Sequence, residues 1–181
     1  MKKIITDIDL IEIARSQSIG PIYAGADLAE IGPLLGMPDS WQFYKNDEWF
    51  NAWMDFGRVE VGFVAASDIV CVDWAKFYVG SFENGFLKFT KVTKTMELRI
   101  RNNFDENEPT LPVVAAAMRE QNIDFSTEVK SFVPEETWGI MHFGEYLSYY
   151  FGCAEGEFSL ENSRLNFISL SISRAELPKR R

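Results

Sequence analysis

Few side chains in this 181-residue sequence are of the types that perform catalysis. His142 is the single histidine, and because it lies in the apolar stretch GIMHFG we interpret it as a structural imidazole. Glu60 and Glu145 each follow a Phe-Gly step, and two carboxylates facing across a cleft would form a glycosidase-like site. The alternative is that both are solvated glutamates on strand faces, as most are. We therefore predict that the protein is not an enzyme.

The two cysteines do not stand at the spacing of a metal or redox motif. Cys71 lies in the apolar run IVCVDW and Cys153 in the sequence GCAEG, so we interpret both as reduced thiols. With one histidine in the chain, neither cysteine has a clear partner for thiol catalysis. The nucleophile elbow, the phosphate-binding loop and the dinucleotide fingerprint are also missing from the sequence. We expect no metal and no cofactor.

An aromatic stretch over residues 41–56 is the strongest candidate for a binding surface. It contains Trp41, Phe43, Tyr44, Trp49, Phe50 and Trp53, interleaved with Asp47, Glu48 and Asp55. Rigid rings in a polar surround are typical of interface anchors. The alternative is that the rings fold back into the core, as most aromatic side chains do, and this is the interpretation we favour. The spacing fits neither a regular strand nor a regular helix.

The charge balance favours a protein partner over a nucleic acid. The chain has 18 basic and 27 acidic side chains and a net charge of −9. Such a surface repels phosphate backbones and accelerates association with a basic protein. The alternative is that the charge serves only solubility. Residues 86–103 are an exception, because five basic side chains and one acidic side chain give them a net charge of +4.

The sequence predicts one cytoplasmic domain over residues 1–181. The N-terminal segment places Asp7 and Asp9 where a signal peptide has its apolar run. The uncharged stretches fall short of the ~20 residues that cross a bilayer. We therefore expect no membrane association.

The hydrophobic pattern predicts an α+β fold with antiparallel sheets and three helices. The expected helices cover residues 7–15, residues 28–35 after an Asp27 N-cap, and a segment from Thr110 to about Gln121. The expected strands cover 59–63, 69–79, 86–91 and 96–101 in the first half, and 125–129, 138–143, 145–151 and 164–172 in the second. A helix followed by a sheet thus occurs twice.

This repetition suggests two related α+β halves, about residues 22–103 and 109–175, that share one core. Phe56-Gly57 and Phe143-Gly144 hold corresponding places in the two halves. Chance similarity is the alternative, because the residue identity between the halves is poor.

One segment also carries a family resemblance. The order GADLAEIGPLLGMPDSW, followed by FGRVEVGF, resembles small immunity-type proteins of bacterial toxin systems, including those of contact-dependent growth inhibition. It covers residues 25–63, about a fifth of the chain. The resemblance implies a cytoplasmic protein that neutralises a cognate toxin domain by binding it. It supplies no functional residues, because each immunity protein is matched to its own toxin.

We therefore predict an immunity-type protein that occludes a basic, nuclease-like toxin surface, with carboxylates standing in for phosphates and aromatic rings as anchors. The candidate contacts are Asp47, Glu48, Trp49, Asp105, Glu106 and Glu108. The alternative is a small-ligand-binding or scaffold domain with an aromatic-lined cleft between the halves and no catalysis.

Overall fold

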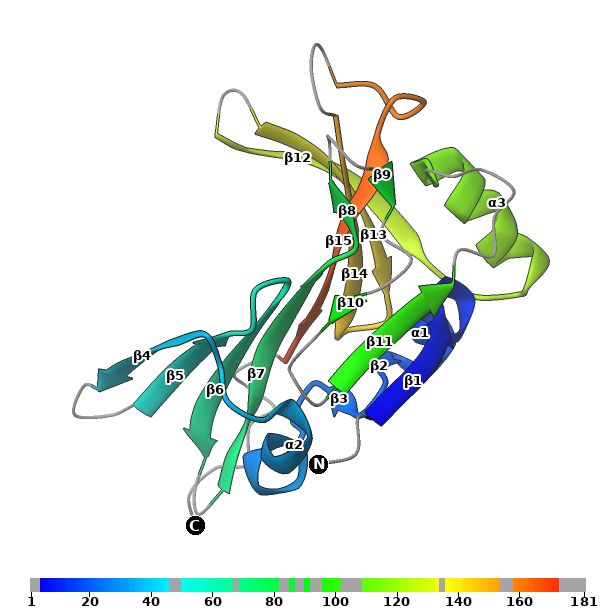
Figure 1. The fold of residues 1–181 in the computed structure, drawn as a ribbon. Coiled ribbons are helices and arrows are strands. Elements are labelled where there is room, and N and C mark those ends of the chain that lie inside the picture. The colour runs from blue at the N-terminus through cyan, green and yellow to red at the C-terminus, as the bar shows by residue number, and fades with distance from the viewer. Residues whose placement is uncertain are drawn as a thin grey trace.

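The computed structural model describes residues 4–45, 50–66, 69–81, 85–86, 90–91, 96–101, 109–133, 136–153 and 158–172. In this part of the chain an eight-stranded antiparallel sheet is combined with three helices and three smaller sheets (Figure 1). The chain therefore has the predicted α+β fold.

The three helices are α1 (Leu10–Ser16), α2 (Leu28–Leu35) and α3 (Leu111–Glu120). The large sheet contains β4 (Ser40–Lys45), β5 (Phe50–Asp55), β6 (Val59–Ala66), β7 (Ile69–Tyr78), β12 (Ser126–Val133), β13 (Glu136–Phe143), β14 (Leu147–Gly152) and β15 (Arg164–Ser171). The smaller sheets contain β1 (Ile4–Asp9), β2 (Ser18–Ile19), β3 (Ile22–Tyr23), β8 (Gly80–Ser81), β9 (Gly85–Phe86), β10 (Thr90–Lys91) and β11 (Met96–Arg101).

The large sheet consists of two units of the same design. Its strand order is β12-β13-β14-β15-β7-β6-β5-β4, so α2 is followed by the meander β4–β7 and α3 by the meander β12–β15. The units meet where their last strands, β7 and β15, pair in antiparallel orientation. Each unit therefore places its first strand at an outer edge of the sheet.

Several local features occur at the same place in both units. Gly57 and Gly144 follow the second strand of their units and have positive φ angles of 87° and 59°, a conformation that favours glycine. The residue that precedes each helix, Asp27 or Thr110, forms an isolated bridge to the last strand of its own unit. The duplication itself stays a prediction, and these shared positions support it.

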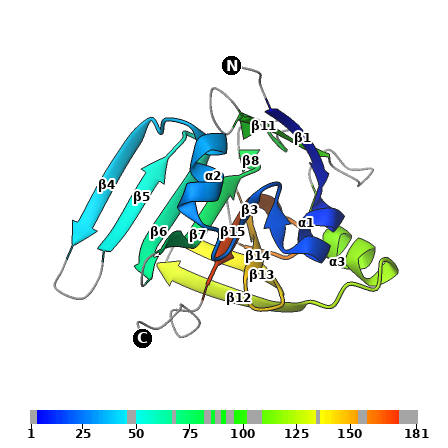
Figure 2. The same ribbon diagram turned by 90° about the horizontal axis from the view of Figure 1, so that it is seen from below.

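Both units contribute to one continuous core. Ile31 and Leu35 of α2, Val114 and Met118 of α3, and Leu10 and Ile13 of α1 belong to a single buried cluster with the inner faces of both meanders. Figures 1 and 2 show α2 against β6 and β7, with α1 and α3 beside the second unit. The buried hydroxyl of Tyr149 donates a hydrogen bond of 2.5 Å to the Leu10 carbonyl, which ties α1 to β14.

The N-terminal segment differs from the prediction. Residues 4–9 form β1, and the first helix begins at Leu10, where the Asp9 side chain accepts a hydrogen bond of 2.6 Å from the Glu12 amide. β1 pairs in parallel with β11, so the predicted strand 96–101 belongs to a separate small sheet. The first unit completes its meander with β4 and β5 instead. An alternating pattern predicts a strand, but it does not identify the partner strand.

The helices of the described segments are short. The longest, α3, has ten residues, and no helix in this part of the chain has the length and apolar character of a membrane span.

Candidate binding site

The edge strand β4 exposes large aromatic side chains. β4 pairs with β5 from Ser40↔Asp55 to Lys45↔Phe50, and it ends the sheet within the described residues. Trp41, Phe43 and Tyr44 are 52%, 55% and 59% exposed. Burial of the aromatic stretch in the core, the favoured interpretation, is therefore wrong for these three rings. Burial in the core is right for Phe56, which directly follows β5 and is 5% exposed.

The position of β4 explains why its rings are exposed and why its pattern was irregular. Successive side chains of a strand point to opposite faces, so Trp41 and Phe43 share one face and Tyr44 lies on the other. Every residue of β4 is exposed, because α2 packs on β7, three strands away. A strand without a buried face carries no alternating signal, which is why β4 could not be recognised from the sequence.

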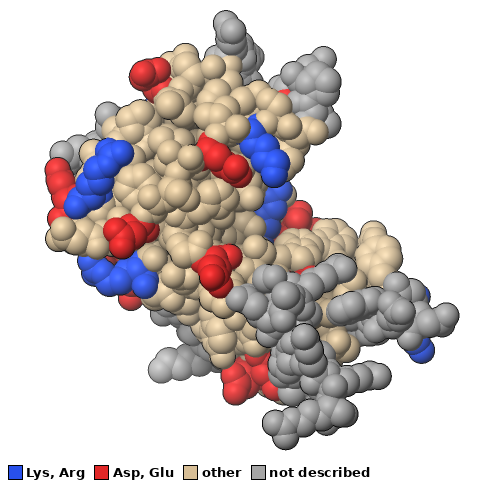
Figure 3. Space-filling view, turned by 180° about the vertical axis from the view of Figure 1, so that it is seen from behind, with Lys and Arg blue, Asp and Glu red and all other residues tan. Residues whose placement is uncertain are grey.

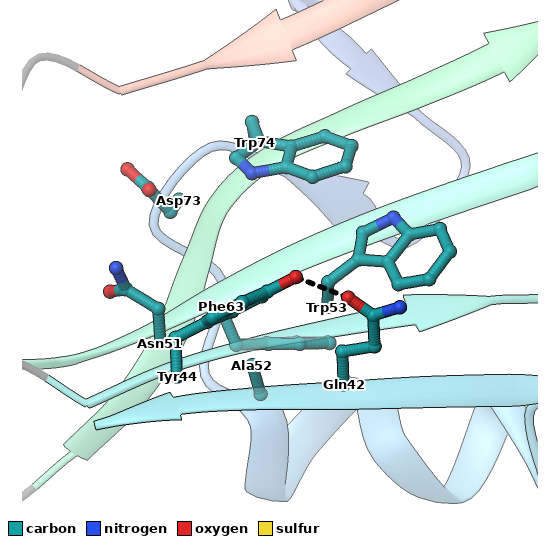
Figure 4. A pocket seen from close by; sticks show the side chains of 8 residues that line it. All are labelled: Gln42, Tyr44, Asn51, Ala52, Trp53, Phe63, Asp73 and Trp74. Carbon is teal, nitrogen blue, oxygen red and sulfur yellow. Dashed lines mark hydrogen bonds between the residues drawn. The ribbon is translucent and has the colours of Figure 1, made fainter.

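A pocket of about 420 Å³ lies beside this edge. It is lined by Gln42, Tyr44, Asn51, Ala52, Trp53, Phe63, Asp73 and Trp74. Figure 4 shows the indole rings of Trp53 and Trp74 around it, with Asp73 and Asn51 at the end away from Trp53. The Tyr44 hydroxyl donates a hydrogen bond to the Gln42 side-chain oxygen.

Register and a glycine determine where the Trp74 ring lies. Gln42, Trp53, Gly62 and Trp74 stand opposite one another on four neighbouring strands, so they form one row across the sheet. Gly62 contributes no side chain to this row, and the Trp74 ring lies directly over it. A Cβ atom at Gly62 would be 2.1 Å from the Trp74 Nε1 atom. The missing side chain therefore leaves room for the Trp74 ring, which covers Gly62 at one side of the pocket.

A β-bulge adds Asp73. Gly62 pairs with Trp74 and Phe63 pairs with Val72, so Asp73 is the extra residue on β7. Bulges redirect side chains, and here a carboxylate joins a pocket whose other lining residues are uncharged. The bulge is held from both sides, because the Val72 amide donates to the Ala26 carbonyl and the Ile172 amide donates to the Asp73 carbonyl, each at 2.8 Å.

The pocket has an unmatched acceptor and a negative surrounding. The Asn51 Oδ1 atom is buried and has no hydrogen-bond partner among the described residues, which costs stability. On β7, two residues before Asp73, burial raises the pKa of the Cys71 thiol, and the negative charges of Asp73 and Asp27 raise it further. The site thus places negative charge beside aromatic rings.

The six predicted contact residues do not lie in the described part of the chain. Asp47, Glu48 and Trp49 belong to residues 46–49, which join β4 to β5, and Asp105, Glu106 and Glu108 belong to residues 102–108. Their prediction is therefore untested. The pocket residues Asn51, Asp73 and Trp74 were missed, although a lone aspartate in the apolar run IVCVDW was a usable signal.

The predicted carboxylate pair is separated by the sheet. Leu147, Leu170, Ala75 and Val61 stand in register on β14, β15, β7 and β6. Glu145 lies two residues before this row on the β14 side and Glu60 one residue before it on β6, and these two strands run in opposite directions. Three strand spacings across the sheet and three residue rises along it therefore place their backbones about 17 Å apart. Glu60 also accepts a hydrogen bond of 3.3 Å from the Tyr78 hydroxyl. A glycosidase needs a shorter separation.

A second arrangement resembles a catalytic triad in connectivity. On β14, β13 and β12, the Ser148 Oγ atom lies 2.8 Å from His142 Nδ1, and His142 Nε2 lies 3.2 Å from Glu128 Oε1. β14 is paired on both sides, so the backbone N–H groups around Ser148 take part in strand pairing instead of forming an oxyanion hole. We interpret the three side chains as cross-strand partners. Within the described residues, no group of three His, Cys, Asp or Glu side chains is placed to hold a metal ion.

Comparisons with protein-family models, with curated proteins and with solved structures all found nothing similar. The site must therefore be interpreted from its own geometry. Figure 3 shows one face of the molecule, where Lys and Arg are interspersed with Asp and Glu around a large uncharged area. This face is not a continuous acidic surface.

Proposed function

We propose that this chain is a non-catalytic, immunity-type protein that binds a cognate toxin domain at the β4 edge in the cytoplasm. The observation that carries the proposal is three exposed rings, Trp41 and Phe43 on one face and Tyr44 on the other, on the strand that ends the sheet within the described residues. Large exposed aromatic side chains are typical anchors of protein interfaces. An open edge also offers backbone hydrogen bonds to an added strand of a partner.

The two edges of the sheet differ in a way that supports this choice. On β12, the other outer strand, Val129 and Phe132 are exposed, but Glu128 and Lys130 accompany them. The Lys130 ammonium lies 5.2 Å from the centre of the Phe132 ring. Charged side chains on an edge strand discourage pairing with other chains. β4 has three aromatic rings and a single charged residue, Lys45, at its end.

The charge of the chain supports a basic partner. A net charge of −9 accelerates association with a positively charged domain, such as one that binds nucleic acid. The toxin would be inhibited because the bound chain covers its active surface.

Co-expression tests this proposal. The probe is the C-terminal domain of the protein encoded immediately upstream of the gene for this chain. We expect the chain to restore growth when that domain is induced, and the purified pair to elute as one complex. The triple variant Trp41→Ala/Phe43→Ala/Tyr44→Ala should weaken binding at least 100-fold, whereas Val129→Ala/Phe132→Ala on the opposite edge should bind as tightly as the wild type.

Two results would contradict the proposal at different points. If the upstream domain neither binds the wild type nor is neutralised by it, the immunity function is wrong. If it binds the triple variant with unchanged affinity, the β4 edge is not the interface.

The pocket favours a second candidate, a small-ligand-binding domain. Its volume of about 420 Å³ lies in the range of small-molecule sites, and its aromatic walls surround a few polar groups. A screen of small aromatic and polar compounds by thermal shift would test this function. It would be supported by a compound whose stabilising effect is lost in Trp74→Ala and retained in the β4 triple variant.

A further inference from the structure

We propose that β12 pairs with β12 of a second copy of this chain, so that two large sheets join into one antiparallel sheet. This inference goes beyond the proposed function, because it concerns the opposite edge of the sheet and does not involve the toxin. Three properties of β12 carry it: an open edge with exposed apolar side chains, the direction of its backbone groups, and charges that match in one register.

β12 is the open edge of the second unit. It is an outer strand of the large sheet, and no described strand lies beyond it (Figure 2). Residues 126–132 are all exposed, and among them Val129 and Phe132 are 57% and 51% exposed. An edge strand with exposed apolar side chains is a template for pairing with another strand. The backbone and the charges of β12 determine which strand fits.

The pairing pattern of the sheet identifies the backbone groups of β12 that face this edge. The Ser171 amide donates a hydrogen bond of 2.8 Å to the Tyr146 carbonyl, so these two residues form a hydrogen-bonded pair between β15 and the residue before β14. In antiparallel sheets such pairs recur at every second residue, and the residues between them bond to the strand on the other side. Followed through the registers of β14 and β13, this alternation makes Ile140 and Glu128 a hydrogen-bonded pair. The groups that point away from β13 therefore belong to the alternate residues Thr127, Val129 and Ser131.

Charge selects one register for the pair. A two-fold axis joins the two strands in antiparallel orientation, and outward residues must pair with outward residues. Registers near the middle of β12 therefore place the axis at Glu128, Val129 or Lys130. With the axis at Glu128 or Lys130, two like charges stand directly opposite each other, which is destabilising. With the axis at Val129, Glu128 stands opposite Lys130 of the second copy, and symmetry forms this pair twice.

Both charged side chains are placed for this contact. Residues between the hydrogen-bonded pairs bring their side chains closest together, and Glu128 and Lys130 occupy such positions when Val129 lies on the axis. The Glu128 side chain is 50% exposed, and its Oε1 atom lies 3.2 Å from His142 Nε2, while a carboxylate has a second oxygen that can accept from lysine. The Lys130 ammonium lies 5.2 Å from the centre of the Phe132 ring and has three N–H donors. The new ion pair can therefore form while both existing contacts remain.

The same charges exclude unrelated strands. Charged side chains on an edge discourage pairing, because an arriving strand must match both signs at the right positions. A second copy matches them by symmetry. The β12 pair leaves a β4 strand at each end of the joined sheet, because β4 and β12 are the outer strands of each copy (Figure 1). Each copy therefore keeps the edge that we assign to the toxin.

Charge exchange tests the pairing and its register. The full chain is studied by sedimentation equilibrium from low micromolar to near-millimolar concentration, because an interface of one strand pair is small and its dimer is weak. We expect a reversible monomer–dimer equilibrium for the wild type. Glu128→Lys and Lys130→Glu should each weaken the dimer at least tenfold, because each variant places like charges opposite each other. An equimolar mixture of the two variants should dimerise as the wild type does, because the lysines of one chain then face the glutamates of the other.

The mixture separates a lost ion pair from a damaged fold, because mixing does not restore a misfolded chain. The matched control is the triple variant Trp41→Ala/Phe43→Ala/Tyr44→Ala on the opposite edge, which should dimerise as the wild type does. A wild type that stays monomeric over the whole concentration range would overturn the inference. A dimer that the charge variants leave unchanged, that the mixture does not restore, or that the triple variant abolishes would overturn it as well. None of these outcomes bears on toxin binding, which co-expression tests separately.

Discussion

Replacing Gly62 with alanine tests how closely the Trp74 ring packs on β6. The added Cβ atom would lie 2.1, 2.4 and 2.6 Å from three atoms of the Trp74 indole, and these distances are far below van der Waals contact. The indole is rigid, so the whole ring must move away from β6. Overpacking of this kind costs about 1–3 kcal/mol. Trp74 is half-buried and can swing toward solvent, so we expect the lower half of that range, about 1–2 kcal/mol.

A double-mutant cycle separates this clash from other effects of the substitution. Gly62 does not have a positive φ angle, so alanine fits the backbone and reduces the entropy of the unfolded chain, a gain of about 0.4–1 kcal/mol. In a Trp74→Ala background the clash is gone, and Gly62→Ala should then be neutral or stabilising. The expected coupling between the two sites is therefore about 1–2 kcal/mol, the full cost of the clash, measured by urea unfolding.

A matched control uses a glycine with room for a Cβ atom. In α2, the Cβ of Gly32→Ala would meet the nearest Leu28 atom at 3.4 Å, which is ordinary contact. This substitution should stabilise the protein by about 0.5–1 kcal/mol, the helix preference of alanine over glycine. If Gly62→Ala has the same cost with and without Trp74, the ring does not lie over Gly62 and the described packing is wrong.

Three further outcomes are expected. Burial, assisted by the charge of Asp9, holds the pKa of Tyr149 well above its ordinary value, so only the unfolded chain ionises there above pH 10. Stability should fall as pH rises beyond 10, by up to about 1.4 kcal/mol per pH unit for this group, and Tyr149→Phe should flatten that fall in urea titrations. Asp27→Ala should lower the free energy of unfolding in urea by about 1 kcal/mol, because the Asp27 carboxylate accepts a hydrogen bond of 2.8 Å from the Ala29 amide at the start of α2. Thr110→Val should be near neutral, because the Thr110 side chain makes no such bond to α3. With an aromatic disulfide reagent, Cys153 should react faster than the buried Cys71, whose pKa is raised by burial and by nearby carboxylates.

The sequence predicted the parts of the fold that carry strong local signals. The Asp27 cap, the helix ending at Gly36 and the alternating strand from Val59 to Phe63 all lie where their patterns indicated. The sequence did not predict β1, because Asp7 and Asp9 are also compatible with the start of a helix. The segment forms a strand because it pairs with β11. Tertiary pairing of this kind overrides local preference.

The site was predictable only in part for the same reason. The aromatic stretch was recognised as a candidate surface, but the exposure of its rings depends on how far α2 extends over the sheet. The pocket gathers residues from β4, β5, β6 and β7, and Asp73 reaches it through a bulge. A bulge depends on the register between two strands, and register is a long-range property.

The antiparallel pairing of β7 with β15 has an evolutionary consequence. Two copies of one unit, placed about a two-fold axis through such a central pair, would build the same eight-stranded sheet. If the predicted duplication is right, this central pair is the former interface of a symmetric dimer whose subunits were later fused. Fusion frees the outer strands from symmetry, because each copy then accumulates its own substitutions. One edge could gain charged side chains while the other kept the aromatic rings that we assign to partner binding.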